Sequence, residues 1–298
     1  MKNSARLVSW DIPQAFRVHH WTKNFLLFLP IVLSHEWGNS RLIAESIWAF
    51  ACLLVVTSAT YLINDISDIN SDRQHWSKRH RPIASGRLPV GAALVLACLL
   101  LVAGFAGALV LSLPFTLTLL CYLVLTLAYS FGLKRIALLD TLVISILFTL
   151  RLVMGVVLLD VQKPAWLLTF SVFFFFSLAM AKRHTEVLRA AQVTPKGLEG
   201  RGYEPGDAPL TLALGTGTAI ASLVVLFIFI VLEMLPANTY GHPALLSGIP
   251  AMLAIWLGRI WLLAHRGRMD DDPVSFALRD WPSLVLGILV AAIFIAAL

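Results

Sequence analysis

The sequence predicts an all-α polytopic membrane protein, built as a bundle of nine transmembrane helices. Two observations lead to this prediction. Of the 298 residues, 58% are hydrophobic and only 13% are charged, which is about half the charged share of a soluble domain. Apolar stretches of roughly 20 residues, the length that crosses a bilayer, recur along the whole chain. Because lipid offers no hydrogen bonds to the backbone, each stretch is expected to be a helix.

The predicted spans follow one another with short polar connections. They lie near residues 18–36, 42–63, 89–112, 114–130, 137–159, 164–181, 210–235, 245–264 and 281–298. Pro114 cannot continue a helix, so the third and fourth spans are predicted to form a tight hairpin. We expect one integral membrane domain over residues 1–298, with motif-bearing loops near 64–88 and 182–209. The first twenty residues contain Asp11, Pro13 and Arg17, so no cleavable signal peptide is predicted.

The 23 lysines and arginines divide unevenly between the two ends of the spans. Twenty lie in the N-terminal region up to Lys23, in the connections after the second, fourth and sixth spans, or in the stretch from Arg259 to Arg279. Only Arg41 and Lys163 lie in the other connections, and Arg151 lies inside a span. Positively charged connections face the cytoplasm. The N-terminus and the motif loops are therefore predicted to be cytoplasmic, with the C-terminus across the cell (inner) membrane. The same rule explains the net charge of +6 without nucleic acid as a partner.

The second span ends in an acidic cluster, "NDISDINSD", residues 64–72. If the helix continues past Asn64, Asp65, Asp68 and Asp72 share one face. Carboxylates about 6 Å apart repel by roughly 3 kcal/mol at an effective dielectric near 20. Magnesium, which takes carboxylates, waters and substrate phosphates, would convert that repulsion into ligation. The alternative is a solvated helix end whose acids pair with neighbouring basic side chains. The basic stretch "KRHRPIASGRLP" that follows favours a cradle of metal and cations for a pyrophosphate.

The acidic cluster resembles a known motif. "NDISDINSD" is similar to the Asn-Asp-x-x-Asp-x-x-x-Asp motif of the UbiA superfamily of intramembrane prenyltransferases, and "RPIASG" looks like that family's Arg-Pro-x-x-x-Gly loop. The resemblance covers essentially the whole chain and implies a nine-helix UbiA-like bundle. It also implies that Asp65, Asp68 and Asp72 bind catalytic Mg²⁺, with Asn64 and Arg81 at the substrate.

The connection after the sixth span departs from most of that superfamily. Where a second aspartate-rich motif is usual, this chain has "MAKRHTEVLRA", in which Lys182 and Arg183 accompany a single carboxylate, Glu186. This is similar to the Lys-Arg-x-x-Glu pattern of the decaprenyl-phosphate phosphoribosyltransferase branch. Further resemblance to that branch appears in "HHWTKNFLLFLP" (19–30), "AYSFGLKRIALLDTLVISILFTLRLVMG" (128–155) and "GRGYEPGD" (200–207).

That branch implies a UbiA-family glycosyltransferase of cell envelope biosynthesis. It would move 5-phosphoribose from phosphoribosyl pyrophosphate to a polyprenyl phosphate and release pyrophosphate, with Mg²⁺ as cofactor. Lys182, Arg183 and Glu186 are then expected to hold the donor. The lipid phosphate is already ionised at neutral pH, so no strong general base is expected. His184 lies among these residues, and its role stays open.

Ionisable residues inside the spans point to the same substrates. Arg151 lies deep in the fifth span, where a charge costs about 2.5–3.5 kcal/mol on insertion scales. Together with Lys23 and Lys134 it is expected to receive a phosphate, although Lys23 could instead snorkel to the interface. Tyr129 could bring a hydroxyl to the site or belong to an interfacial aromatic belt. Direct pairing of Arg151 with Asp140 is not expected, because eleven residues of helix span about 16 Å.

Two rival functions fit parts of the sequence. A UbiA-type prenyltransferase that moves a prenyl group from a prenyl diphosphate to an aromatic or lipid acceptor predicts the second aspartate motif, which the sequence lacks. An ion-coupled lipid or solute transporter predicts ionisable groups near the bilayer midplane and broken helices. Nearly all charges lie at one membrane face instead, which favours an enzyme. Asp270, Asp271 and Asp272 are predicted to be a solvated loop.

Overall fold

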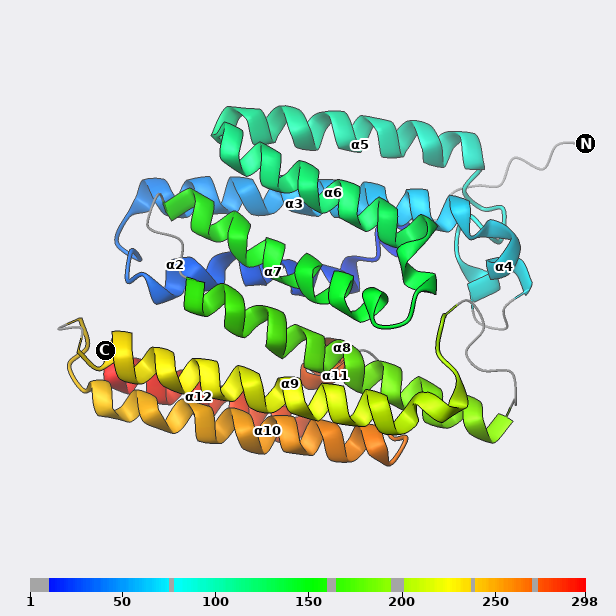
Figure 1. Cartoon of the computed structure of the whole chain (residues 1–298). Coiled ribbons are helices and arrows are strands. Elements are labelled where there is room, and N and C mark those ends of the chain that lie inside the picture. Colours follow the sequence, from blue (N-terminus) through cyan, green and yellow to red (C-terminus); the bar gives the residue numbers. More distant parts are fainter. Residues whose placement is uncertain (1–10, 75–77, 160–164, 194–200, 237–238, 270–272) are drawn as a thin grey trace, which may run out of the picture. The chain divides into compact units, whose positions relative to one another are not determined.

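A computed structural model describes residues 11–74, 78–159, 165–193, 201–236, 239–269 and 273–298. Every regular element among these residues is a helix, as predicted (Figure 1). Contacts between Cα atoms divide the chain into two compact units. Unit 1 comprises Met1–Gly132 and Leu150–Gln162, and unit 2 comprises Leu133–Thr149 and Lys163–Leu298. The single domain over residues 1–298 stays a prediction.

Unit 1 is organised around its longest helix, α3. Its elements are α1 (Asp11–Ala15), the 3₁₀ helix η1 (Val18–Phe28), α2 (Leu29–Leu33), α3 (Ser40–Ser67), α4 (Ile69–Gln74), the short η2 (Lys78–His80), α5 (Val90–Leu111), α6 (Leu113–Phe131) and the second half of α7 (Leu139–Leu159). α3 packs against η1, α5 and α6. The hairpin between α5 and α6 is confirmed: the Ser112 side chain accepts a hydrogen bond from the Phe115 N–H at 3.2 Å, with Pro114 in the first turn of α6. Such a cap satisfies one of the unpaired donors at a helix start.

Unit 2 is built on the antiparallel pair α8 and α9, which Figure 1 shows beside α10. Its elements are η3 (Leu133–Arg135), the first half of α7, α8 (Ala165–Val193), η4 (Pro205–Asp207), α9 (Ala208–Phe229), the π-helical turn η5 (Ile230–Met234), η6 (Pro243–Ser247), α10 (Gly248–His265), α11 (Pro273–Ala277) and α12 (Trp281–Ala297). α10 contacts α8, α9 and α12. The bidentate pairing of Arg259 with Asp280, at 2.5 and 2.9 Å, ties α10 to the start of α12.

The number of spans differs in part from the prediction. Within the described residues, seven helices are long and apolar enough to cross a membrane, and they correspond to the second through eighth predicted spans. The first and ninth predicted spans appear as shorter apolar helices, Trp21–Leu33 and Trp281–Ala297. Seven spans are therefore supported by length and composition, and the predicted count of nine is not confirmed.

The first apolar segment has an unusual backbone. η1 runs as a 3₁₀ helix for 11 residues, whereas 3₁₀ runs beyond three or four residues are uncommon. Arg17, just before it, has a φ of 51° in the left-handed region. A 3₁₀ helix rises about 2.0 Å per residue, so η1 covers about 22 Å, against about 16 Å for the same residues in an α-helix. The segment thus reaches further than its residue count suggests.

A buried polar contact joins three helices of unit 2. Ser177 of α8 donates a hydrogen bond to the Gly215 carbonyl of α9 at 2.7 Å, and Trp261 Nε1 of α10 donates to Ser177 Oγ at 3.0 Å. A Cβ atom at Gly215 would lie 2.1 Å from Cζ2 of Trp261. Small residues at such contacts allow membrane helices to approach closely.

Gly215→Ala is therefore expected to destabilise unit 2 by about 1–3 kcal/mol, because the added methyl group must displace the Trp261 ring. Gly217→Ala is the matched control in the same helix, since nothing lies within 4 Å of a Cβ there. The control should be neutral or stabilising by up to about 1 kcal/mol, because alanine is favoured over glycine in helices. Thermal unfolding in detergent measures both variants. Equal melting temperatures would contradict the close contact.

Candidate active site

The acidic cluster of unit 1 surrounds a break between two helices. α3 ends at Ser67, and Asp68 follows as its C-cap with φ −91° and ψ 7°. The Asp68 N–H donates to the Asn64 carbonyl at 2.9 Å, which completes the last turn, and α4 begins at Ile69. The unbroken helix that would place all three aspartates on one face is therefore not formed. The physical reason is that aspartate competes for backbone hydrogen bonds and favours helix ends.

Two of the aspartates still converge on one positive group. Asp65 and Asp72 are each 2% exposed. Nη1 of Arg81 lies 3.2 Å from Oδ1 of Asp65 and 2.6 Å from Oδ2 of Asp72. Arg17 also forms an ion pair with Asp65, and its guanidinium lies 4.9 Å from the centre of the Tyr61 ring. Arg81 is therefore a central residue of the cluster, and its role at the substrate stays a prediction. Arg17 is a partner that the sequence reasoning missed.

The third aspartate has a different environment. Asp68 is half-buried and accepts a hydrogen bond from Asn64 Nδ2 at 3.2 Å. Among the residues that the structure describes, no three His, Cys, Asp or Glu side chains are grouped closely enough to hold a metal ion. The donors nevertheless fit magnesium in kind, because they are hard carboxylate oxygens. Two carboxylates that meet at one guanidinium nitrogen also supply the convergent negative charge that a divalent cation requires.

Arg151 lies in a second polar cluster of unit 1. This side chain is buried, and its Nε donates to Asn24 Oδ1 at 2.9 Å while Nη2 donates to the Tyr122 hydroxyl at 2.8 Å. Asn24 Nδ2 in turn donates to Thr57 Oγ1 at 3.3 Å. Thr57 precedes Asp65 by eight residues on α3, or about 12 Å along the axis. The arginine therefore belongs to a cluster deeper in the apolar segment than the aspartates.

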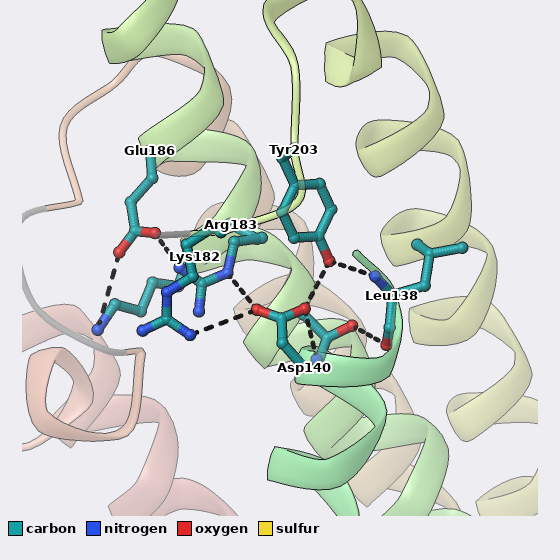
Figure 2. Close-up of polar contacts among 8 residues, drawn as sticks. Leu138, Asp140, Lys182, Arg183, Glu186 and Tyr203 are labelled. Carbon is teal, nitrogen blue, oxygen red and sulfur yellow. Dashed lines mark hydrogen bonds and ion pairs between the residues drawn. The ribbon is translucent and has the colours of Figure 1, made fainter. Parts of the chain in front are cut away.

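Unit 2 carries the predicted basic cluster in the second half of α8 (Figure 2). Arg183 is 2% exposed and forms an ion pair with Glu186, one turn further along the helix. Lys182 Nζ lies 4.0 Å from Glu186 Oε1, and both of these side chains are partly exposed. The structure therefore brings Lys182, Arg183 and Glu186 together, as the sequence predicts. Arg189, three residues after Glu186 on α8, instead donates to the Gly267 carbonyl at 2.8 Å.

The sequence reasoning missed three members of this cluster: Asp140, Tyr203 and Arg201, whose Nη1 lies 3.7 Å from Asp140 Oδ2. Asp140 is fully buried, and its Oδ2 lies 2.8 Å from Arg183 Nε. The Tyr203 hydroxyl donates to Asp140 Oδ1 at 2.7 Å. Burial raises the pKa of Tyr203, and the hydrogen bond to Asp140 raises it further, so the phenol stays protonated as a donor. Tyr203 lies within the quoted segment "GRGYEPGD", which was the available signal, but its partner Asp140 is far away in the sequence.

The remaining predicted residues lie in several elements. Lys23 lies in η1 and Tyr129 near the end of α6, both in unit 1 and both half-buried. Lys134 lies in η3 of unit 2 and is also half-buried. Their roles at a substrate stay predictions. The predicted loop at 270–272 lies outside the described residues.

The family of the chain follows from its sequence and its fold. The UbiA prenyltransferase family matches residues 27–284. The chain therefore belongs to this family, and its long apolar helices make it an integral membrane protein.

Relatives in other bacteria differ in how much of their length they share with this chain. Uncharacterized protein y4nM of Sinorhizobium fredii is 46% identical over 95% of this chain, but the match covers 55% of y4nM, so the chain spans about half of that relative. Nodulation protein NoeC of Azorhizobium caulinodans is 33% identical, with 95% of this chain and 92% of NoeC covered. Decaprenyl-phosphate phosphoribosyltransferase of Mycobacterium tuberculosis is 34% identical over 61% of this chain and 62% of that enzyme.

Solved structures share the fold. A structure described for digeranylgeranylglyceryl phosphate synthase has a TM-score of 0.71 at 16% identity, with 97% of this chain and 98% of that chain covered. A UbiA homolog from Archaeoglobus fulgidus bound to GPP and Mg²⁺ has a TM-score of 0.68 at 16% identity, with 96% and 98% covered. At this identity the likeness concerns the fold alone, and it confirms the predicted UbiA-like helical architecture.

Proposed function

We propose that this chain transfers 5-phosphoribose from phosphoribosyl pyrophosphate to a polyprenyl phosphate and releases pyrophosphate, with Mg²⁺ as cofactor. The observation that carries the proposal is the basic cluster of unit 2. This cluster has three cations and two carboxylates, which leaves one net positive charge. Its members are Lys182, Arg183, Arg201, Asp140 and Glu186. A water-soluble donor with several phosphates would be attracted by such a cluster.

One group of relatives, which matches part of the chain, supports the same reaction. The Mycobacterium tuberculosis enzyme, which shares 61% of this chain at 34% identity, is a decaprenyl-phosphate phosphoribosyltransferase. A second aspartate motif, the mark of transfer from a prenyl diphosphate in this superfamily, is replaced here by Lys182 and Arg183. Phosphoribosyl pyrophosphate as donor therefore suits the chain better than a prenyl diphosphate.

The acidic cluster of unit 1 is assigned to the leaving group. When bound, Mg²⁺ would neutralise charge on the departing pyrophosphate. Asp65 and Asp72 are proposed to hold the ion, with Asp68 beside them. Arg81, which contacts both buried carboxylates, is proposed to shift toward the pyrophosphate and to bind its oxygens as a charge-assisted donor.

The reaction exchanges one bond for another at the anomeric carbon. The bond from this carbon to the pyrophosphate oxygen breaks, and the carbon bonds to an oxygen of the lipid phosphate. Positive charge develops on the ribose in the transition state, so stabilising the leaving group is the main requirement. The attacking phosphate is already ionised, and no side chain must remove a proton.

The positive-inside rule supports the orientation that the proposal needs. The N-terminus and both clusters are proposed to lie at the cytoplasmic face of the inner membrane, where a water-soluble donor is available. The C-terminus is proposed to lie on the opposite side. An attached reporter at each terminus would test this orientation.

The proposed reaction is tested with purified protein, phosphoribosyl pyrophosphate labelled in its ribose, and a panel of polyprenyl phosphates of different lengths. Magnesium-dependent transfer of label into the lipid phase is the expected result. Label that stays in water, together with transfer from a labelled prenyl diphosphate to an aromatic or lipid acceptor, would replace the proposal with the prenyltransferase function. Uptake of an ion or lipid into vesicles without any covalent product would identify a transporter.

A further inference from the structure

We propose that Tyr203 and Asp140 are positioning residues that hold Arg183 in place for the phosphates of the donor. The inference rests on the proposed function, because it assigns these residues to the site that binds the donor. It concerns a brace between two segments of unit 2. One is residues 135–140, which run from the end of η3 through a turn into the start of α7, and the other is residues 201–203. Figure 2 shows the brace beside Arg183.

The backbone is strained in the turn just before α7, the helix whose first turn contains Asp140. Leu138 has a φ of 65°, a left-handed conformation that is uncommon for a residue with a branched side chain. The Tyr203 hydroxyl oxygen accepts a hydrogen bond from the Leu138 N–H at 2.9 Å and donates its own proton to Asp140 Oδ1 at 2.7 Å. One hydroxyl therefore fixes both the strained residue and the carboxylate. Strained conformations of this kind persist only where the surrounding structure enforces them.

The second segment fits closely against the turn. A Cβ atom at Gly202 would lie 2.7 Å from the Arg135 carbonyl oxygen and 2.8 Å from the Ala137 nitrogen. Because both neighbours are backbone atoms, they cannot move aside as a flexible side chain would. Glycine at this position therefore allows the close approach that brings the next residue, Tyr203, to the turn.

The carboxylate that the brace holds is the buried partner of Arg183. Asp140 is 0% exposed and Arg183 is 2% exposed, and their charges lie 2.8 Å apart. Arg201, two residues before Tyr203, also approaches Asp140 Oδ2, at 3.7 Å. A buried guanidinium needs a fixed counter-charge. The position of Arg183 thus depends on Asp140, and the orientation of Asp140 depends on Tyr203.

The outer edge of the same network is open to solvent. The side chain of Glu186 is 31% exposed and that of Lys182 is 40% exposed, and both lie next to Arg183 along α8. A phosphate that reaches Lys182 would therefore meet an arginine whose place is already fixed. Fixing the arginine in advance lowers the cost of ordering it at binding. The brace is expected to act on donor affinity rather than on the chemical step.

Tyr203→Phe tests the inference, because it removes the hydroxyl and keeps the ring. The KM for phosphoribosyl pyrophosphate is expected to rise about tenfold, the size expected for one hydrogen bond to a charged group. The KM for the lipid phosphate and the kcat should change little. Amide hydrogen exchange in residues 133–140 should become faster. Gly202→Ala, which displaces the segment by steric contact, should produce the same pattern.

Tyr240→Phe is the control, because this tyrosine packs against Phe294 in another part of unit 2. It should leave the donor KM and the exchange of residues 133–140 unchanged. Faster exchange in Tyr203→Phe with an unchanged donor KM would make the brace purely structural and overturn the inference. Unchanged exchange would overturn it as well, since no brace would then exist.

The same variants distinguish failure of the inference from failure of the proposed function. If the wild-type protein transfers no phosphoribose, the proposed function fails, and binding of inorganic pyrophosphate by calorimetry replaces the KM. Weaker pyrophosphate binding in Tyr203→Phe than in Tyr240→Phe would uphold the brace as a positioning device for phosphates. Equal binding in both variants, or none in the wild type, would overturn it.

Discussion

Asp65→Asn is expected to reduce magnesium-dependent turnover by about 10²–10³-fold, the loss typical of removing one preorganised electrostatic group. Asparagine keeps the shape of the side chain and one acceptor oxygen but removes the negative charge. The fold should persist, because Arg81 keeps Asp72 as a partner at 2.6 Å. Turnover per folded molecule, measured with labelled donor at several magnesium concentrations, is the measurement.

The control for this variant is Glu45→Gln at the opposite end of the same helix. Glu45 forms an ion pair with Arg41, whose side chain is 88% exposed. Removing such a surface pair changes stability by no more than about 1 kcal/mol. Turnover of Glu45→Gln should equal that of the wild type. Turnover of Asp65→Asn close to the wild-type value would remove this aspartate from the metal site.

Arg151→Gln is expected to raise the KM for the lipid phosphate by about 10–100-fold, which corresponds to the loss of one charge-assisted hydrogen bond. Glutamine keeps an amide that can donate to Asn24 or Tyr122, the observed hydrogen-bond partners of the arginine. It removes the buried positive charge. The cluster lies about 12 Å deeper along α3 than Asp65, a depth that suits the phosphate of a lipid better than a water-soluble donor.

The melting temperature of Arg151→Gln distinguishes a role of Arg151 in lipid binding from a role in holding the fold together. A charge in the apolar segment costs about 2.5–3.5 kcal/mol, so its removal should leave the melting temperature unchanged or higher. A structural arginine would instead show a lower melting temperature with an unchanged KM for the lipid. Arg41→Gln is the matched control, because it removes the same charge from an exposed position of unit 1. This control should change neither the melting temperature nor the KM for the lipid phosphate.

Much of the helical architecture could be predicted because bilayer thickness and backbone hydrogen bonding set the length of each span. The break at Asp68 could not, because helical periodicity carries no information about where the backbone leaves the helix. The first segment also differs, since apolar composition does not distinguish a 3₁₀ helix from an α-helix. Pro114 was a clear signal for the hairpin because proline restricts the backbone itself.

The candidate site could be predicted only where its members are close in the sequence. Lys182, Arg183 and Glu186 are neighbours on one helix, and their spacing alone brings them together. Arg17 and Asp140 contact partners that are distant in the chain, so they emerge only from tertiary structure. Both are counter-charges of buried groups, which composition and spacing do not mark. With these two residues, the candidate site consists of two ionic networks instead of two short motifs.

The larger rise per residue of η1 has a mechanical consequence for the buried Arg151. Conversion of its 11 residues from 3₁₀ to α geometry would shorten the segment by about 6 Å, at about 0.5 Å per residue. Asn24, which lies within this segment, would be withdrawn and rotated away from Arg151. Such a change in the winding of η1 would then release the guanidinium of Arg151 from its amide partner, with no displacement of α3 or α7.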